Sequence, residues 1–367
     1  MRWIRSLALV FTVSLALVGG CKEKSTQPTF EQVAKPQFSI PGGTYQASQT
    51  VSITCATLGV TIRYTTDGSE PNSAALVYQA PISITHTSTI KAKAYRDGYR
   101  DSETAATQYV IDIQYPENFV FVEGGTFNNG SSDVTVSSFY IDKYEVTQAG
   151  YEAVMGVNPS HFSGNPNRPV EQVSWFNAIE YCNRRSMQEG LTPCFSYGTF
   201  GTNPDEWPTG WNTDYNNHIN VSCNWTANGY RLPTEMEWMF AAKGGNHGQG
   251  YTYSGSDDID AVAWYWGNSD IGDGQGRRTH DVGLKATNEL GTFDMSGNVW
   301  EWVWDIYGSY PGTSQTNPTG ADSGFYRVER GGGWQYDAIS CTVSSRYDLD
   351  ATDSYLVLGF RLVRRSP

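Results

Sequence analysis

The chain has little positive charge. Its 25 Lys and Arg residues stand against 38 Asp and Glu residues, which gives a formal net charge of −13. Because nucleic-acid binding depends on cations that neutralise phosphates, this balance disfavours DNA or RNA as a partner. A Gly-x-Ser-x-Gly nucleophile elbow, a P-loop and a dinucleotide fingerprint are all absent from the sequence. The enzyme classes that these motifs mark are therefore not indicated.

Histidine is also scarce, and this bears on iron chemistry. The five histidines are His86, His161, His218, His247 and His280. None lies three or four residues from another, and the first belongs to a different segment from the rest. A non-haem iron site usually needs two histidines and a carboxylate that converge, so the sequence disfavours one.

Long apolar runs are missing after the N-terminus, so no later segment is expected to cross a membrane. The apolar run at residues 7–18 follows Arg2 and Arg5 and is too short to span a bilayer. These features predict a secretory signal over residues 1–20.

The end of this signal resembles a bacterial lipobox, Val-Gly-Gly-Cys. The resemblance implies that Cys21 is lipidated and becomes the first residue of the mature protein, whereas the alternative is an ordinary signal with a chance cysteine. The polar residues 21–35 are predicted to form a tether. Because Lys22 is not acidic, we expect a lipid-anchored protein of the bacterial cell envelope, in the outer membrane or at the cell surface.

The remaining cysteines are few. They are Cys55, Cys182, Cys194, Cys223 and Cys341. An exported protein tolerates disulfides, and the last four allow two bridges in three possible pairings. Because Cys194 and Cys223 flank one long insertion, we expect them to pair, which leaves Cys182 for Cys341. Cys55 alternates with Val51 and Ile53, so it is expected to be a buried small residue.

Residues 36–113 alternate polar and apolar residues in short segments between turn residues, which predicts a small β-sandwich. The segments PGGTYQASQTVSI, IRYTTDGSEPN, YQAPISI and TIKAKAYRDGYRDS resemble the chitobiase/hexosaminidase C-terminal-type domain. That resemblance implies an immunoglobulin-like accessory domain. The loop at residues 65–71 offers a candidate sugar or metal site, but a plain turn explains it as well.

The rest of the chain predicts an α+β domain with long loops. Residues 139–155 are expected to pass from a strand into a helix, and two further helices are expected in residues 169–188 and 228–245. Thr147 and Ser174 are predicted N-caps, and Thr234 with Glu237 forms a capping box. Between these helices the sequence is rich in Gly, Asn, Asp and Trp, so a small antiparallel core is expected.

Eight motifs in this part occur in the order of the formylglycine-generating enzyme, or sulfatase-modifying factor, family. They are GGTF, FYIDKYEVTQAGY, NPSHF, PVEQVSW, NGYRLPTEMEW, NELGTFDMSGNVWEW, RVERGGGW and LGFRL. The resemblance covers residues 116–367 and implies that family's variant of the C-type lectin fold. Active members resemble one another in two cysteines, five residues apart, that hold Cu(I) and activate dioxygen. Here Tyr336 stands five residues before Cys341, so we expect no copper and assign no catalytic residue.

The resemblance also implies a structural calcium site. Its predicted ligands are the oxygens of Asp294, Gly297, Val299 and Glu301, of the hard type that calcium prefers. The alternative is that Asp294 caps a turn and Glu301 pairs with an arginine such as Arg330. A second family site maps, across an alignment gap, to Asn268, Ser269 and Asp273.

The segment at residues 335–357 lies between the motifs RGGGW and LGFRL. Except for Gln335, each residue has a codon that ends in a pyrimidine, and Met, Lys, Trp and Glu are missing. This resembles the variable region of retroelement-diversified proteins, which display a ligand-binding face on the same fold. The predicted contact residues are Trp334, Tyr336, Ile339, Ser340, Thr342, Ser345, Tyr347, Leu349, Ala351, Tyr355, Leu356 and Val357. The alternative is an ordinary buried core segment.

These features predict an exported lipoprotein with a non-catalytic, calcium-stabilised, lectin-like head. Its expected partners are the membrane, through the lipid anchor, and an unidentified protein or glycan, because abundant Trp and Tyr suit such ligands. Two alternatives remain. One is an oxidase of the formylglycine-generating type with altered ligands, and the other is a structural component of the envelope.

Overall fold

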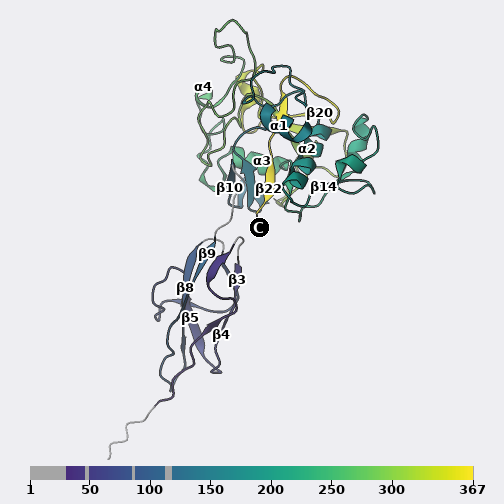
Figure 1. Cartoon of the computed structure of the whole chain (residues 1–367). Helices are drawn as coiled ribbons and strands as arrows, with labels where there is room; N and C mark the ends of the chain where they lie inside the picture. Colours follow the sequence, from purple (N-terminus) through teal and green to yellow (C-terminus); the bar gives the residue numbers. More distant parts are fainter. Residues whose placement is uncertain (1–29, 46–48, 85–86, 112–117, 367) are drawn as a thin grey trace, which may run out of the picture. The chain divides into compact units, whose positions relative to one another are not determined.

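The computed structural model describes residues 30–45, 49–84, 87–111 and 118–366 (Figure 1). The predicted signal peptide 1–20, Cys21 and most of the tether 21–35 lie outside the described residues. The chain divides into two compact units between residues 113 and 114, and each is described by itself. None of the helices in the described residues is long and apolar enough to span a membrane.

The N-terminal unit is built from short strands. They are β1 (Gln37–Phe38), β2 (Gly43–Tyr45), β3 (Gln49–Val51), β4 (Ile53–Thr54), β5 (Thr61–Thr65), β6 (Leu76–Val77), β7 (Ile82–Ile84), β8 (Ser88–Tyr95) and β9 (Ala105–Ile111). One sheet has the order β2-β9-β8-β5-β6, and β1-β4 and β3-β7 form two small pairs. Residues from all three sheets or their edges share one core, which includes Val51, Ile53, Ile84 and Tyr109. The predicted β-rich N-terminal domain is therefore confirmed.

The C-terminal unit contains helices and several sheets. Its helices are α1 (Gln148–Met155), α2 (Trp175–Gln188), α3 (Glu235–Ala242) and α4 (Ile259–Val262), with short 3-10 helices η1 (Pro204–Glu206), η2 (Tyr215–Asn220), η3 (Gly245–His247) and η4 (Ala338–Cys341). Its strands are β10 (Phe119–Val122), β11 (Gly125–Asn128), β12 (Asp133–Val136), β13 (Phe139–Asp142), β14 (Phe195–Tyr197), β15 (Val221–Cys223), β16 (Tyr230–Arg231), β17 (Trp300–Ile306), β18 (Gln315–Thr316), β19 (Tyr326–Arg330), β20 (Arg346–Asp350), β21 (Leu358–Phe360) and β22 (Val363–Arg365).

Two four-stranded sheets organise this unit. One has the order β10-β13-β22-β16 and the other β20-β19-β17-β21. Helix α3 packs on the second sheet, because Trp238 and Met239 join Val303 of β17 and Val328 of β19 in one buried core. Long connections with little regular structure make up much of the remainder, as the Gly-rich and Asn-rich sequence predicts.

The helix starts follow the predicted caps. The Thr147 hydroxyl accepts a hydrogen bond from the backbone N–H of Gly150 at the start of α1, and Ser174 caps α2 in the same way. Thr234 and Glu237 form the predicted capping box of α3. Helix α3 ends at Ala242, earlier than its pattern suggests, because Gly244 adopts a positive φ of 87°.

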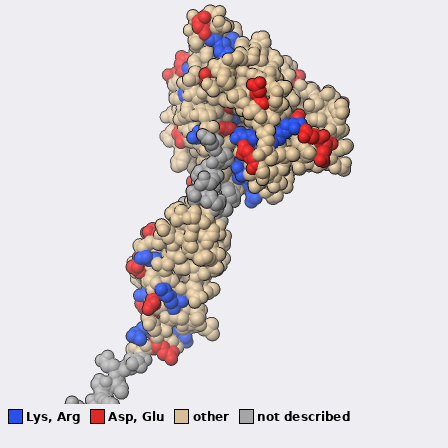
Figure 2. Space-filling view, viewed as in Figure 1, with Lys and Arg blue, Asp and Glu red and all other residues tan. Residues whose placement is uncertain are grey.

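Charged side chains lie singly or in small groups on the visible surface of both units, between large uncharged areas (Figure 2). Only 17% of the residues are charged, so wide uncharged areas are expected. The negative net charge is therefore spread over the surface in view, and Figure 2 shows no continuous basic face that would suit a polyanion.

Candidate functional site

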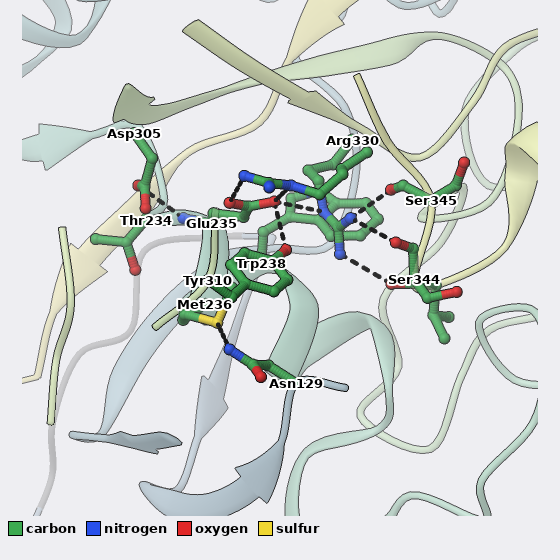
Figure 3. Close-up of polar contacts among 12 residues, drawn as sticks. Asn129, Thr234, Glu235, Met236, Trp238, Asp305, Tyr310, Arg330, Ser344 and Ser345 are labelled. Carbon is green, nitrogen blue, oxygen red and sulfur yellow. Dashed lines mark hydrogen bonds and ion pairs between the residues drawn. The ribbon is translucent and has the colours of Figure 1, made fainter. Parts of the chain in front are cut away.

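The predicted binding segment is attached to the fold through its main chain. The guanidinium of Arg330, in β19, donates to the backbone carbonyls of Val343, Ser344 and Ser345. It also lies over the ring of Trp238 and beside Glu235, both in α3 (Figure 3). These contacts of Arg330 reach the backbone of the segment and so do not depend on the identity of residues 343–345.

Trp334 fixes the other part of the segment. Its side chain is 7% exposed, and its Nε1 donates to the carbonyl of Leu356 over 3.0 Å. Its ring also packs edge-on against Phe162, with 5.3 Å between centroids. Trp334 therefore braces the segment, and its burial leaves little of its side chain for contact with a ligand. Ala351 and Val357 are buried as well, so they too belong to the core.

Other predicted contact residues do reach the surface. Ile339 is 74% exposed, Tyr347 is 56% exposed and Tyr355 is 48% exposed. The half-buried members of the predicted face are Tyr336, Ser340, Thr342, Ser345, Leu349 and Leu356. The segment is therefore not an ordinary core segment, because large apolar and aromatic side chains remain accessible along it.

Behind these residues lies a group that the sequence analysis did not single out. Trp300, at the start of β17, is buried and meets Tyr336 and Tyr347, with ring centroids 5.6 Å and 5.5 Å away. Glu329 in β19 is the register partner of Tyr347 in β20, so the two side chains share one face of the sheet. We call Trp300, Glu329, Tyr336 and Tyr347 the Glu329 cluster.

Glu329 is electrostatically unusual. Its side chain is 4% exposed, and no hydrogen bond or ion pair joins it to any other side chain that the structure describes. Burial raises the pKa of its carboxyl to about 8, and the negative charges of Asp348 and Asp353 add to that rise. Buried carboxylates in proteins are normally paired, so this one departs from the usual arrangement.

The positions of the family's two cysteines hold no thiolate pair. Cys341 is fully buried, and burial raises the pKa of its thiol to about 12. Its sulfur packs so closely on Gly332 that a Cβ there would lie 2.6 Å from it. Tyr336 is a half-buried phenol, and its burial raises its pKa too. A neutral thiol and a phenol are poor ligands for Cu(I), which prefers thiolates.

The predicted disulfides are absent from the described residues, where Cys55, Cys182, Cys194, Cys223 and Cys341 are all free. The pairing of Cys182 with Cys341 is wrong because Cys182, in α2, has Cys194 and Cys223 as its cysteine neighbours. Cys194 and Cys223 remain unbonded as well, and in the β14–β15 pair Cys223 lies opposite Phe195 rather than Cys194. Burial raises the pKa of all three thiols.

The predicted calcium ligands fit a cation only in part. One oxygen of Asp294 accepts from the N–H of Gly283 over 2.7 Å, whereas Oδ1 is buried with no partner in the described structure. Glu301, in contrast, binds the guanidinium of Arg361 with both oxygens at 2.6 Å and accepts from Trp238 over 2.8 Å. The geometry therefore suits Asp294 as a ligand, and it places an ion pair where Glu301 was expected to bind calcium.

The backbone N–H groups of Gly297 and Val299 are engaged, but these bonds do not use the carbonyl oxygens that were the predicted calcium ligands. The N–H of Gly297 donates to Gly331, and the N–H of Val299 donates to the buried carboxylate of Glu145. Burial raises the pKa of Glu145 far above its usual value, and the charges of Asp294 and Glu301 raise it further. The region holds an excess of acidic groups, which favours a cation at Asp294 on charge alone.

The second predicted calcium site does not fit. The Asn268 amide donates to the carbonyl of Ala263, and the Ser269 hydroxyl donates to the carbonyl of Trp334. Asp273 forms an ion pair with Arg278 instead. No group of three or more His, Cys, Asp or Glu side chains within the described ranges is arranged to hold a metal ion.

Comparison with known proteins shows which families the two parts of the chain resemble. A model described as a sulfatase-modifying factor enzyme 1-like domain matches residues 108–366, and a chitobiase/beta-hexosaminidase C-terminal domain matches residues 40–107. The chain is 42% identical to a Paenibacillus barcinonensis protein named chaperone protein LppX over 266 residues, which are 68% of this chain and 89% of the relative. It is 24% identical to the formylglycine-generating enzyme of Mus musculus over 321 residues, which are 72% and 83% of the two chains.

One solved structure supports the same assignment. Treponema denticola variable protein 1 matches with a TM-score of 0.57 and 31% identity, over 74% of this chain and 98% of that one. The predicted two-part architecture, a β-rich N-terminal domain before a C-type lectin-like head, is therefore confirmed. By the family match, the motifs and the fold, the chain belongs to the formylglycine-generating enzyme, or sulfatase-modifying factor, family.

Proposed function

We propose that the C-terminal unit is a non-catalytic ligand-binding head. The observation that carries this proposal is the contrast at the family's catalytic positions. Cys341 is buried with a raised pKa, whereas Ile339, Tyr347 and Tyr355 present large side chains to solvent. Rigid exposed aromatic side chains are the residues that anchor protein ligands in many interfaces. The similarity to a protein named as variable supports the same interpretation.

We further propose that the protein is exported and lipid-anchored in a bacterial cell envelope through Cys21. The N-terminal sequence supports this, with its basic start, short apolar run and lipobox-like end. The name of the Paenibacillus relative is compatible with an envelope lipoprotein. Along the chain, the N-terminal β-rich domain lies between Cys21 and the binding head.

A peptide-oxidation assay tests the catalytic part of this proposal. The purified chain is incubated with copper, dioxygen and a cysteine-containing sulfatase peptide, and mass spectrometry measures formylglycine. We expect no product above background, because the Cys341 thiol stays protonated and Tyr336 replaces its partner. An active formylglycine-generating enzyme is the positive control. Aldehyde formed by this chain, and lost in a Cys341→Ser variant, would contradict a non-catalytic head.

Chaperone action is a second candidate, and the 42% identical relative named as a chaperone is the observation in its favour. Ile339 and Tyr347 offer the exposed apolar surface that binding of a non-native protein requires. If this surface binds such chains, the wild type should slow the light-scattering aggregation of reduced lysozyme at equimolar ratio. An Ile339→Ser, Tyr347→Ser variant should lose most of that protection. Equal protection by both proteins would argue against a role for this surface.

A further inference from the structure

We propose that the Glu329 cluster binds a cationic side chain, the ammonium of lysine or the guanidinium of arginine, on a protein ligand. This inference rests on the proposed binding function and names the chemistry that the head recognises. Its starting point is an unpaired carboxylate that is 4% exposed and lies on the same sheet face as an exposed tyrosine.

The strand register brings the members of the Glu329 cluster together. Glu329 lies opposite Tyr347 in β20 and opposite Trp302 in β17, so it occupies the middle of the sheet β20-β19-β17-β21. Trp300 lies two residues before Trp302 on β17, and its ring contacts both tyrosines of the cluster. Tyr336 reaches the same place from the turn before η4 and lies within electrostatic range of Glu329.

The neighbouring arginines cannot neutralise Glu329. Arg330 is adjacent in β19, so its side chain points to the opposite face of the sheet, where it binds backbone carbonyls. Arg346 pairs in register with Arg330, shares that opposite face and binds Glu235. The charges that act on Glu329 are those of Asp348 and Asp353, both negative. A ligand cation would therefore supply the missing partner.

The aromatic rings around the carboxylate suit such a ligand. The ring plane of Tyr336 is at 90° to that of Trp300, and the ring plane of Tyr347 is at 60° to it. Aromatic rings attract cations through their quadrupoles, so a cation paired with Glu329 would gain from the neighbouring rings as well. A neutral apolar group would gain the contacts with the rings but would leave the carboxylate without a partner.

The surroundings of the cluster indicate a protein as the source of the cation. Tyr347 and Tyr355, which lies within electrostatic range of Glu329, are both exposed, so accessible aromatic surface lies beside the carboxylate. Lysine and arginine carry long apolar stems that pack on such a surface while the charged end reaches inward. A small free amine would use the carboxylate and leave most of this surface uncovered.

The test is a titration of the full mature chain followed by nuclear magnetic resonance. The probes are N-acetyl-lysine methylamide, N-acetyl-arginine methylamide and the neutral N-acetyl-norleucine methylamide. We expect both cationic probes to bind in the millimolar range and the norleucine probe to bind at least tenfold more weakly. Glu329→Gln should weaken the cationic probes at least tenfold, whereas Asp322→Asn, which removes an exposed carboxylate elsewhere, should change nothing. Melting temperatures measured on both variants exclude unfolding as the cause.

Selection of displayed peptides that bind the wild type and the variants distinguishes failure of this inference from failure of the proposed binding function. Selected peptides are expected to carry Lys or Arg at one common position and to lose at least tenfold in affinity on Glu329→Gln. Peptides without a basic residue that bind through Tyr347, and are insensitive to Glu329→Gln, would overturn the inference and leave a binding head intact. Failure of both cationic probes to bind at concentrations up to about 20 mM, where a millimolar Kd would give clear binding, would overturn it as well.

Discussion

Replacing Arg361 with methionine is expected to destabilise the C-terminal unit by about 3–5 kcal/mol, the range found when one partner of a buried ion pair is removed. Both side chains of the Arg361–Glu301 pair are fully buried, and two hydrogen bonds of 2.6 Å join them. The guanidinium also donates to the carbonyls of Asp142 and Phe293. The variant leaves Glu301 charged and buried beside Glu145, whose own charge is already unfavourable.

Urea denaturation monitored by tryptophan fluorescence measures this loss. The matched control is the double variant Glu301→Leu, Arg361→Met, which removes both charges and should recover a large part of the stability. Measurements with EDTA distinguish the effect of the ion pair from that of a calcium ion at the predicted site. If Glu301 stabilises the fold through Arg361 alone, EDTA leaves the stability lost in Arg361→Met unchanged. A melting temperature that falls with EDTA and recovers with calcium would instead support a cation at Asp294. A cost below about 1 kcal/mol for Arg361→Met would contradict the central role of the pair.

Glu329→Gln is expected to stabilise the protein at pH 8 and to have little effect at pH 5. The folded-state pKa of this carboxyl is about 8, against a reference value of 4.5, so the folded state binds the proton more tightly than the unfolded state. Its contribution to stability is therefore fully present below pH 4.5 and is lost as the pH rises to 8. At 1.36 kcal/mol per pKa unit, the loss is on the order of 3–5 kcal/mol.

The measurement compares denaturation curves of the wild type and the variant at pH 5, 6.5 and 8. We expect the variant to remove the part of the pH dependence that comes from Glu329 and to leave the part that comes from Asp142, whose pKa is raised to about 7 by burial. Asp322→Asn is again the control. Parallel pH profiles for wild type and Glu329→Gln would mean that Glu329 already has a partner in solution. A stabilising substitution at a binding residue is typical of sites that keep an unfavourable group for their function.

Much of the fold could be predicted because its signals are local or follow a family pattern. Thr147, Ser174 and Thr234 each act as the predicted cap, since capping depends on residues three positions apart. The partner of Glu301 could not be predicted in this way. Arg361 lies 60 positions away, and a sequence alone does not rank it above Arg330. The disulfide pairing failed for the same reason, because elimination among four cysteines contains no information about distance.

The candidate site shows the same division. The exposed residues Ile339, Tyr347 and Tyr355 could be predicted from the unusual composition of their segment. Glu329 could not be predicted. Most of β19 is buried on both faces, so its polar and apolar residues do not alternate in a way that assigns a charged residue to one face. The motif Glu-Arg at the end of that strand was the available signal. Two adjacent charges in a buried strand must point in opposite directions, and only the structure reveals which one lacks a partner.

The attachment of residues 335–357 has a consequence for how this surface can change over generations. Arg330 binds three peptide carbonyls and Trp334 binds a fourth, so part of the segment's shape is set by atoms that every amino acid possesses. Exchanging the outward-facing side chains leaves these grips in place. New specificities can therefore arise in a lineage, or in a synthetic repertoire, by replacing many residues at once without first redesigning the scaffold that carries them.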